Sequence, residues 1–195
     1  MIIQNLFTNI LAIEKDLKLD NKKIEKFCLA LNKKNKDKSK SIYFNFSEPE
    51  LQNLFKIIYE KVNTLHRDLE LSDNFRQEFL NAWLNVGSNE YTSVPHNHND
   101  TFGIMFSGVY YVKTDKKSSI EFVNPNKAQE FVLFSETVKN YNTFTSNTMQ
   151  FQPNTGDLIL FPSWLEHYVL NKPNNKSRIS IAFNTIFRKN EKTKS

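Results

Sequence analysis

Hydrophobic side chains recur every three or four residues in the first part of the chain and every second residue after about residue 80. The first spacing is typical of helices with one apolar face, and the second is typical of strands. Asp20 can cap a helix whose apolar face holds Ile24, Phe27, Cys28 and Leu31. The chain is therefore expected to begin with helices and to continue with strands.

A second helix is predicted after Ser47-Glu48-Pro49-Glu50, because serine can cap a helix and because proline and acids suit its first turn. The apolar positions that follow at helical spacing are Leu51, Leu54, Ile58, Val62 and Leu65. His66 falls at the end of this helix, where we expect an ordinary surface or partly buried histidine.

The segments predicted to be strands are short and rich in β-branched and aromatic residues. They are Trp83–Val86, Phe106–Lys113, Ser119–Val123, Thr148–Phe151, Asp157–Phe161 and Arg178–Phe187. The irregular stretch Asn124–Asn147 could form a lid or active-site loop. The large aromatic residues Trp83, Trp164, Phe106 and Phe161 are expected to lie in the core.

A length of 195 residues makes one domain the default and is sufficient for a sizeable core. We expect residues 1–80 to form a mainly helical lead-in and residues 81–187 to form a strand-rich core. Short strands that follow helices indicate a mainly β, α+β protein. The predicted architecture is a jelly roll whose N-terminal helices pack on one sheet.

The composition narrows the functional classes. The net charge is +5, but the lysine-rich segment Lys33–Lys40 is interpreted as a solvated loop rather than as a nucleic-acid footprint. Cys28 is the single cysteine, so no intrachain disulfide can form and a reducing compartment fits. The first segment does not resemble a signal peptide, and no apolar run approaches the ~18 residues needed to span a membrane. The sequence thus predicts a soluble, cytoplasmic protein.

Three of the four histidines lie in two places, at His96 and His98 and again at His167. Side chains at positions i and i+2 of a strand point the same way, so His96 and His98 can converge on one ion, and so can His98 and Asp100. Two histidines and one carboxylate with open positions form the usual site of non-haem Fe(II) oxygenases. The two pairs share His98, and strand geometry leaves the choice between them open.

Arg178 alternates with Ser180 and Asn184 on one face of the last predicted strand. Such polar groups are costly to bury unless they bind something, and a guanidinium group matches a carboxylate bidentately. Arg178 could therefore hold the carboxylate of an organic cosubstrate. Tyr110 and Tyr111 point to opposite faces of their strand, so one hydroxyl could reach the same carboxylate while the other ring packs.

The segments that carry these residues together resemble a known family. They are Trp83-Leu84-Asn85, His96-Asn97-His98, Ser107–Val112, Gly156–His167 and Arg178–Asn184. They resemble the 2-oxoglutarate- and Fe(II)-dependent oxygenases common in marine bacteria and in phages of cyanobacteria. The resemblance implies a cupin-like double-stranded β-helix fold, a mononuclear Fe(II) and 2-oxoglutarate as cosubstrate.

The resemblance also implies roles for individual residues. It makes His167 the distal iron ligand. It makes Arg178, helped by Ser180, the clamp on the distal carboxylate of 2-oxoglutarate. By likeness to other members of the superfamily, Tyr110 or Tyr111 adds a hydrogen bond to that carboxylate.

For the other iron ligands the resemblance favours His96 and His98, whereas the lower charge of a carboxylate site favours Asp100. The predicted reaction uses dioxygen to hydroxylate an unidentified substrate and releases succinate and CO2. One alternative is a non-catalytic cupin-like module that binds a metal and a small acid. Another, a nucleic-acid-binding protein, rests only on the basic balance. A homodimer is one option for the assembly, and the setting would be the cytoplasm of a bacterium or of a phage-infected host cell.

Overall fold

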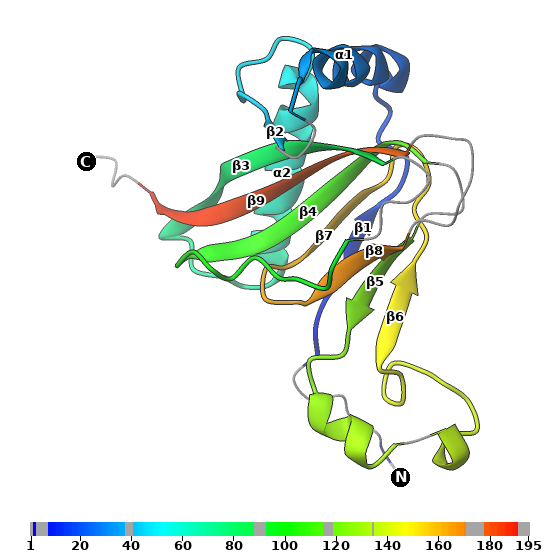
Figure 1. The fold of residues 1–195 in the computed structure, drawn as a ribbon. Helices are drawn as coiled ribbons and strands as arrows, with labels where there is room; N and C mark the ends of the chain where they lie inside the picture. Colours follow the sequence, from blue (N-terminus) through cyan, green and yellow to red (C-terminus); the bar gives the residue numbers. More distant parts are fainter. Residues whose placement is uncertain are drawn as a thin grey trace.

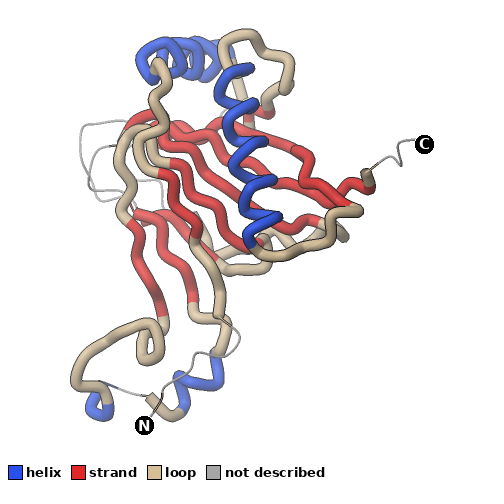
Figure 2. Tube along the Cα trace, turned by 180° about the vertical axis from the view of Figure 1, so that it is seen from behind, coloured by secondary structure: helices blue, strands red, loops and turns tan. Residues whose placement is uncertain are grey.

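Two antiparallel sheets face each other across an apolar layer, and helices pack on the outer side of the larger sheet (Figures 1 and 2). The computed structural model describes residues 2, 8–37, 41–87, 93–114, 119–133, 135–170 and 178–190. The elements in chain order are β1 (Ala12–Glu14), α1 (Asn21–Lys34), β2 (Ile42–Tyr43), α2 (Gln52–Asp68), β3 (Phe75–Gly87), β4 (Ile104–Lys113), β5 (Ser119–Val123), η1 (Lys127–Phe131), η2 (Ser135–Thr137), β6 (Thr148–Phe151), β7 (Leu158–Pro162), β8 (His167–Leu170) and β9 (Arg178–Lys189).

The larger sheet has the strand order β1-β7-β4-β9-β3-β2, and the smaller sheet has the order β6-β5-β8. All of these strand pairs are antiparallel. The last strand, β9, lies in the middle of the larger sheet, between β3 and β4. Residues that are far apart in the sequence are therefore neighbours in this sheet. This arrangement is a double-stranded β-helix, and the predicted fold class is confirmed.

Alternate residues of the larger sheet enter two separate apolar cores. On the side that we call the helix face, Tyr110, Leu158 and Phe183 pack with residues of α1 and α2. On the opposite side, which we call the inner face, Val109, Tyr111, Ile159, Phe161 and Ala182 pack against Ile120 and Phe122 of β5. Figure 2 shows α2 lying across the sheet on the helix face. The inner face is thus the side enclosed between the two sheets.

Glycine is required at one point of the helix face. A Cβ atom at Gly108 of β4 would collide with the ring of Phe183 and with the side chain of Leu160. Both neighbours are buried and belong to adjacent strands. The bare backbone at Gly108 therefore lets the Phe183 ring lie directly on β4.

The helices agree with the sequence prediction except at the start of α2. Asp20 caps α1, because its side chain accepts a hydrogen bond of 3.1 Å from the Lys23 N–H. Helix α2 begins only at Gln52, because Ser47 bonds to the Asn45 side chain (2.8 Å) and residues 47–50 form turns. His66 is fully buried rather than near the surface, and its ring nitrogens bond to Ser72 O (3.2 Å) and Gln77 Nε2 (3.3 Å).

The strands differ from the prediction mainly in length. Strand β3 begins at Phe75, so the expected boundary at residue 80 lies inside it. A register shift between Phe79 and Asn81 interrupts the alternation of side chains there. The first half of the strand therefore does not continue the period-two pattern of the second half, and it was not predicted. Strand β8 was not predicted, and His167 is its first residue.

The described residues of the stretch 124–147 form a loop, as expected, which contains the short helices η1 and η2. Figure 1 shows this segment projecting from the end of the smaller sheet. One ion pair, between Lys127 Nζ and Glu166 Oε1 (3.1 Å), joins it to the turn before β8. In the part of the chain that the structure describes, no helix has the length and apolar character to cross a membrane.

Candidate active site

Three histidines meet at the open edge of the smaller sheet. One ring nitrogen from each of His96, His98 and His167 lies within 4.8 Å of the other two. His96 and His167 pair as an antiparallel bridge, with N–H···O distances of 3.0 and 2.8 Å. The His98 N–H donates to Ser163 O at 2.8 Å, which fixes the second segment of the group. Backbone hydrogen bonds therefore hold all three side chains in place.

Backbone carbonyls also fix which nitrogen two of these rings can offer. His167 Nδ1 lies 2.9 Å from Leu165 O, and His96 Nδ1 lies 2.8 Å from Val94 O. A protonated Nδ1 donates to each carbonyl and leaves the Nε2 lone pair free. This second hydrogen bond is the usual device that orients a metal-binding histidine.

The surroundings of His98 and His167 keep these two rings uncharged. Burial is the main cause that lowers the pKa of His167 to about 3 and that of His98 to about 4. Neighbouring histidines contribute to both shifts, while the hydrogen bond to Leu165 O opposes the shift at His167 and Asp100 opposes the shift at His98. Only a neutral imidazole can donate its lone pair to a metal, so these rings are ready to bind an ion at neutral pH.

Asp100 does not join this group. Its side chain is exposed and contributes no oxygen to the set of ligand atoms within 4.8 Å. Of the two pairs that the sequence left open, the structure brings His96 and His98 together with His167. Three imidazoles in such a cluster match the nitrogen ligands that iron and zinc accept.

Arg178 lies on the inner face, in a part of the site that holds no acidic partner. It is only 5% exposed, and no described carboxylate forms an ion pair with it. Its Cζ atom lies 5.3 Å from the centroid of the Tyr111 ring. Burying a guanidinium without an anion is costly, so this environment fits an anionic ligand.

Two hydroxyl groups beside Arg178 strengthen that fit. Tyr111 of β4 and Ser180 of β9 are register partners, and both are completely buried. Tyr111 Oη and Ser180 Oγ have no hydrogen-bond partner among the described residues. Burial raises the pKa of Tyr111, so its hydroxyl stays protonated and can donate. One guanidinium and two unpaired hydroxyls form a site that a carboxylate would satisfy.

Tyr110 does not reach this site. It lies on the helix face, and its hydroxyl donates to Asn21 Oδ1 at 2.6 Å. Burial raises the pKa of Tyr110 to about 12. Of the two tyrosines that were candidates for the clamp, only Tyr111 faces Arg178, and Tyr110 instead joins β4 to the start of α1.

Sequence reasoning missed part of the site on β3. Trp83 was assigned to the core, and it does pack against the core of the inner face, but it is only partly buried and its ring centroid lies 5.6 Å from that of His98. Asn81 and Asn85 flank it on the same face. The signal was present in the sequence, because these three residues alternate with the apolar residues Ala82, Leu84 and Val86.

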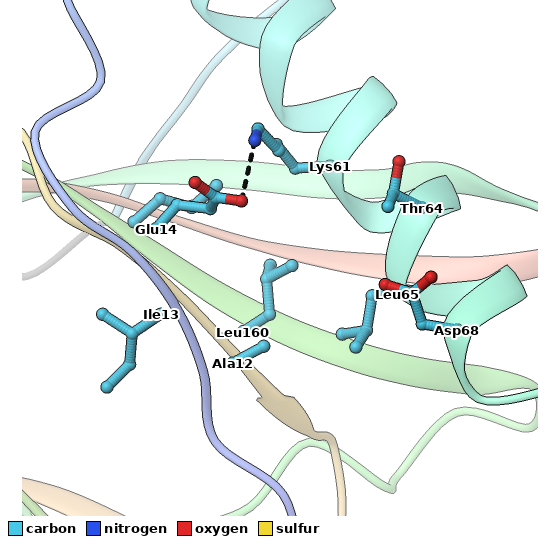
Figure 3. A pocket seen from close by; sticks show the side chains of 9 residues that line it. Ala12, Ile13, Glu14, Lys61, Thr64, Leu65, Asp68 and Leu160 are labelled. Atoms are coloured by element: carbon cyan, nitrogen blue, oxygen red, sulfur yellow. Dashed lines mark hydrogen bonds and ion pairs between the residues drawn. The ribbon is translucent and has the colours of Figure 1, made fainter.

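A separate hollow lies between β1 and α2 (Figure 3). It has a volume of about 90 Å³ and is lined partly by Leu158 and Leu160, with the Glu14–Lys61 ion pair (2.7 Å) at its rim. Both leucines belong to the core of the helix face. The sheet therefore separates this hollow from the histidines, and it is not part of the site.

Comparison with known proteins supports the same chemistry. The model of a family described as "Putative 2OG-Fe(II) oxygenase" matches residues 81–184, more than half of the chain. This range includes the three histidines, Arg178 and Ser180. No curated protein matches the sequence.

Solved structures share the fold at low sequence identity. A prolyl-4-hydroxylase from Pseudomonas putida has a TM-score of 0.60 and 13% identity, with 94% of this chain and 95% of that chain covered. A prolyl hydroxylase from Trichoplax adhaerens, in complex with a peptide fragment of the hypoxia inducible factor oxygen degradation domain, has a TM-score of 0.59 and 13% identity, with 90% and 83% covered. HygX from Streptomyces hygroscopicus, with nickel and 2-oxoglutarate bound, has a TM-score of 0.55 and 10% identity, with 90% and 82% covered. The family match over the segments that build the site shows that this chain belongs to the 2OG-Fe(II) oxygenase family, whose cofactors are Fe(II) and 2-oxoglutarate.

Proposed function

We propose that this protein is a 2-oxoglutarate- and Fe(II)-dependent dioxygenase that hydroxylates a substrate and releases succinate and CO2. In this proposal His96, His98 and His167 hold the iron. Arg178, Ser180 and Tyr111 hold the distal carboxylate of 2-oxoglutarate. The observation that carries the proposal is the cluster of three histidine nitrogens within 4.8 Å, which faces the same space between the sheets as a buried arginine without an ion-pair partner among the described carboxylates.

The iron and the cosubstrate, when bound, supply the activation of dioxygen and the oxidising power. The chain supplies the positions of the reactants. Arg178 and the two hydroxyls orient the distal carboxylate, so that the other end of the cosubstrate points toward the histidines. The apolar residues Val109, Ile159 and Phe161 exclude water from the region between them.

The family match supports an oxygenase, and the hydroxylation step is our extension of it. The prolyl hydroxylases among the structural neighbours make hydroxylation the first reaction to test. The non-catalytic alternative is less well supported, because the family that matches this chain is described as an oxygenase.

The proposal extends to the whole chain. We propose that residues 1–195 form one oxygenase domain, because the helices of residues 1–80 pack on the sheet that carries the site. A cytoplasmic setting, in a bacterium or in the host cell of a phage, is proposed from the lone Cys28 and from the family resemblance. A homodimer stays a prediction.

The metal ligands are tested by substitution. Anaerobic addition of Fe(II) and 2-oxoglutarate should give the wild-type protein a metal-centred absorption band. His96→Ala, His98→Ala and His167→Ala should each abolish the band, and Asp100→Ala should keep it because Asp100 lies outside the cluster. An unchanged band in His167→Ala would remove the basis of the metal centre. A band that survives His96→Ala but not Asp100→Ala would make Asp100 the third ligand and leave the oxygenase proposal standing.

Turnover is tested by measuring succinate. Iron-loaded wild-type protein should convert 2-oxoglutarate to succinate when dioxygen is admitted, and a true substrate should increase the rate. Binding of both cofactors without succinate release under any condition would favour the non-catalytic module.

A further inference from the structure

Three rows of side chains cross the inner face of the larger sheet, each with one residue from β3, β9 and β4. The clamp row is Asn85, Ser180 and Tyr111, the middle row is Trp83, Ala182 and Val109, and the amide row is Asn81, Asn184 and Ser107. Successive rows lie about 7 Å apart, since two residues of a strand span that length. The clamp row is the one next to Arg178, and the amide row is the farthest from it.

The histidine cluster stands over the middle and amide rows. The His98 ring lies 5.6 Å from Trp83 of the middle row. The His167 ring lies 4.7 Å from Phe161, which is the register partner of Ser107 on β7. A cosubstrate that extends from the clamp row to the histidines therefore leaves the amide row free beside the metal, where a substrate would lie.

A relay of hydrogen bonds fixes the amide row. Ser107 Oγ donates to Asn184 Oδ1 at 2.7 Å, and Asn184 Nδ2 donates to Asn81 Oδ1 at 3.1 Å. Ser107 and Asn184 are 2% and 4% exposed, so the relay is held within the protein. Asn81 is only partly buried and stands at the end of the relay.

The relay leaves one group unused. Asn81 Oδ1 is occupied by Asn184, whereas Asn81 Nδ2 makes no hydrogen bond with any described residue. Because Asn81 points its Oδ1 atom at Asn184, the two N–H bonds of Asn81 Nδ2 point away from the relay. Such a group recognises an acceptor oxygen.

The surroundings of Asn81 indicate an uncharged acceptor. The next polar residue on this face of β3, Glu78, pairs with Arg76 and with Arg188 (3.5 Å), so these arginines already have an anionic partner. Trp83, two residues after Asn81, offers an apolar ring against which a carbon skeleton can pack. A neutral amide carbonyl attached to such a skeleton fits both features.

We propose that Asn81, oriented by Asn184 and Ser107, positions the substrate by donating hydrogen bonds to a neutral amide carbonyl oxygen, of the kind that a peptide residue presents. This inference rests on the proposed function, because it places the substrate relative to the iron and the cosubstrate. Asn81 is then a positioning residue for substrate and has no part in holding either cofactor.

The test uses N-acetyl amino-acid amides as probes, since each is uncharged and carries two amide carbonyls. Binding to wild-type protein loaded with Zn(II) and 2-oxoglutarate is followed by saturation-transfer NMR, which does not depend on activity. At least one probe should bind, and the same probe should stimulate succinate release by the Fe(II) form. Asn81→Leu and Asn81→Asp should each weaken that binding about tenfold, because both remove the donor N–H groups.

Asn81→Asp keeps an oxygen that can accept the hydrogen bond from Asn184 Nδ2. Weaker probe binding by this variant would therefore come from the lost N–H donors and not from a disturbed relay. Asn53→Leu is the matched control, because Asn53 is exposed on α2 and should leave probe binding unchanged. All three variants should bind 2-oxoglutarate with wild-type affinity, as measured by the absorption band of the Fe(II)–2-oxoglutarate complex.

Failure of the inference is distinguishable from failure of the proposed function. If wild-type protein gives the absorption band but binds no probe, or if Asn81→Leu binds the probe normally, only the substrate inference is overturned. If Asn81→Leu instead loses affinity for 2-oxoglutarate, the amide row serves the cosubstrate and the inference is overturned as well. If wild-type protein gives no band, the proposed function fails and the inference fails with it.

Discussion

Arg178 is the residue on which the proposed cosubstrate site depends most. Its guanidinium is buried beside the Tyr111 ring and two unpaired hydroxyls, with no described acidic side chain to neutralise it. The site is therefore complete only when an anion is present. Burial of the guanidinium carries a desolvation cost, which a bound carboxylate would offset.

Arg178→Ala should weaken 2-oxoglutarate binding by about a hundredfold or more, because losing one partner of a buried charge pair costs ~3–5 kcal/mol. Arg178→Lys should recover only part of the affinity, since lysine lacks the guanidinium fork. Titration of the Fe(II) form with 2-oxoglutarate measures both effects. Arg188→Ala, at an exposed position of the same strand, is the control. Equal affinity in wild type and Arg178→Ala would show that the carboxylate binds elsewhere.

The buried histidines predict a pH dependence of the metal-free protein. The pKa values of His98 and His167 are lowered to about 4 and about 3, whereas both should titrate near 6.5 in the unfolded chain. The unfolded state therefore binds more protons between these values, and the free energy of unfolding should fall as the pH drops from about 6.5 toward 4. Urea denaturation at several pH values measures it. Between pH 6.5 and 5, where most carboxylates stay ionised, the free energy of unfolding of His167→Gln should fall less steeply than that of wild type. If the two proteins lose stability with the same slope, protonation of His167 is not the cause.

At the scale of elements, strand β4 is constrained by its neighbours on both faces. Gly108→Ala should lower the free energy of unfolding by about 1–3 kcal/mol, because the added methyl group would press on the buried Phe183 ring and Leu160. Chemical denaturation measures the change. The double variant Gly108→Ala, Phe183→Leu should recover part of the loss, since the two positions share one space. Additive losses in the double variant would mean that the strain arises elsewhere.

The elements also show what a pattern of apolar residues can and cannot predict. The start of helix α1 and the bounds of strands β5 and β6 agree with the sequence prediction, because they follow from capping and from local strand patterns. The first half of β3 was not predicted because of its register shift, and β8 was not predicted because it is four residues long and begins with a candidate metal ligand. Both failures come from tertiary pairing, which a local pattern does not contain.

For the whole molecule, the sequence predicted the jelly roll, the candidate metal-binding histidines and the arginine, because each lies in a recognisable segment. It could not choose between His96 and Asp100, since both are two residues from His98 on one chain segment. The pairing of His96 with His167 brings His96 beside the distal histidine, and it is a contact between distant parts of the chain. The alternation of Asn81 and Trp83 with apolar residues is present in the sequence, but their place near the histidines follows only from the sheet, in which β9 joins β3 to β4.

Strand β4 gives its odd-numbered side chains Ser107, Val109 and Tyr111 to the inner face, while Gly108 and Tyr110 belong to the helix face. Along this strand, residues that face the proposed site thus alternate with residues that pack against the helices. Substitutions at the odd-numbered positions would therefore alter the proposed site, whereas the helices pack on the even-numbered positions. A lineage of such proteins could change its site along this strand without first having to rebuild its scaffold.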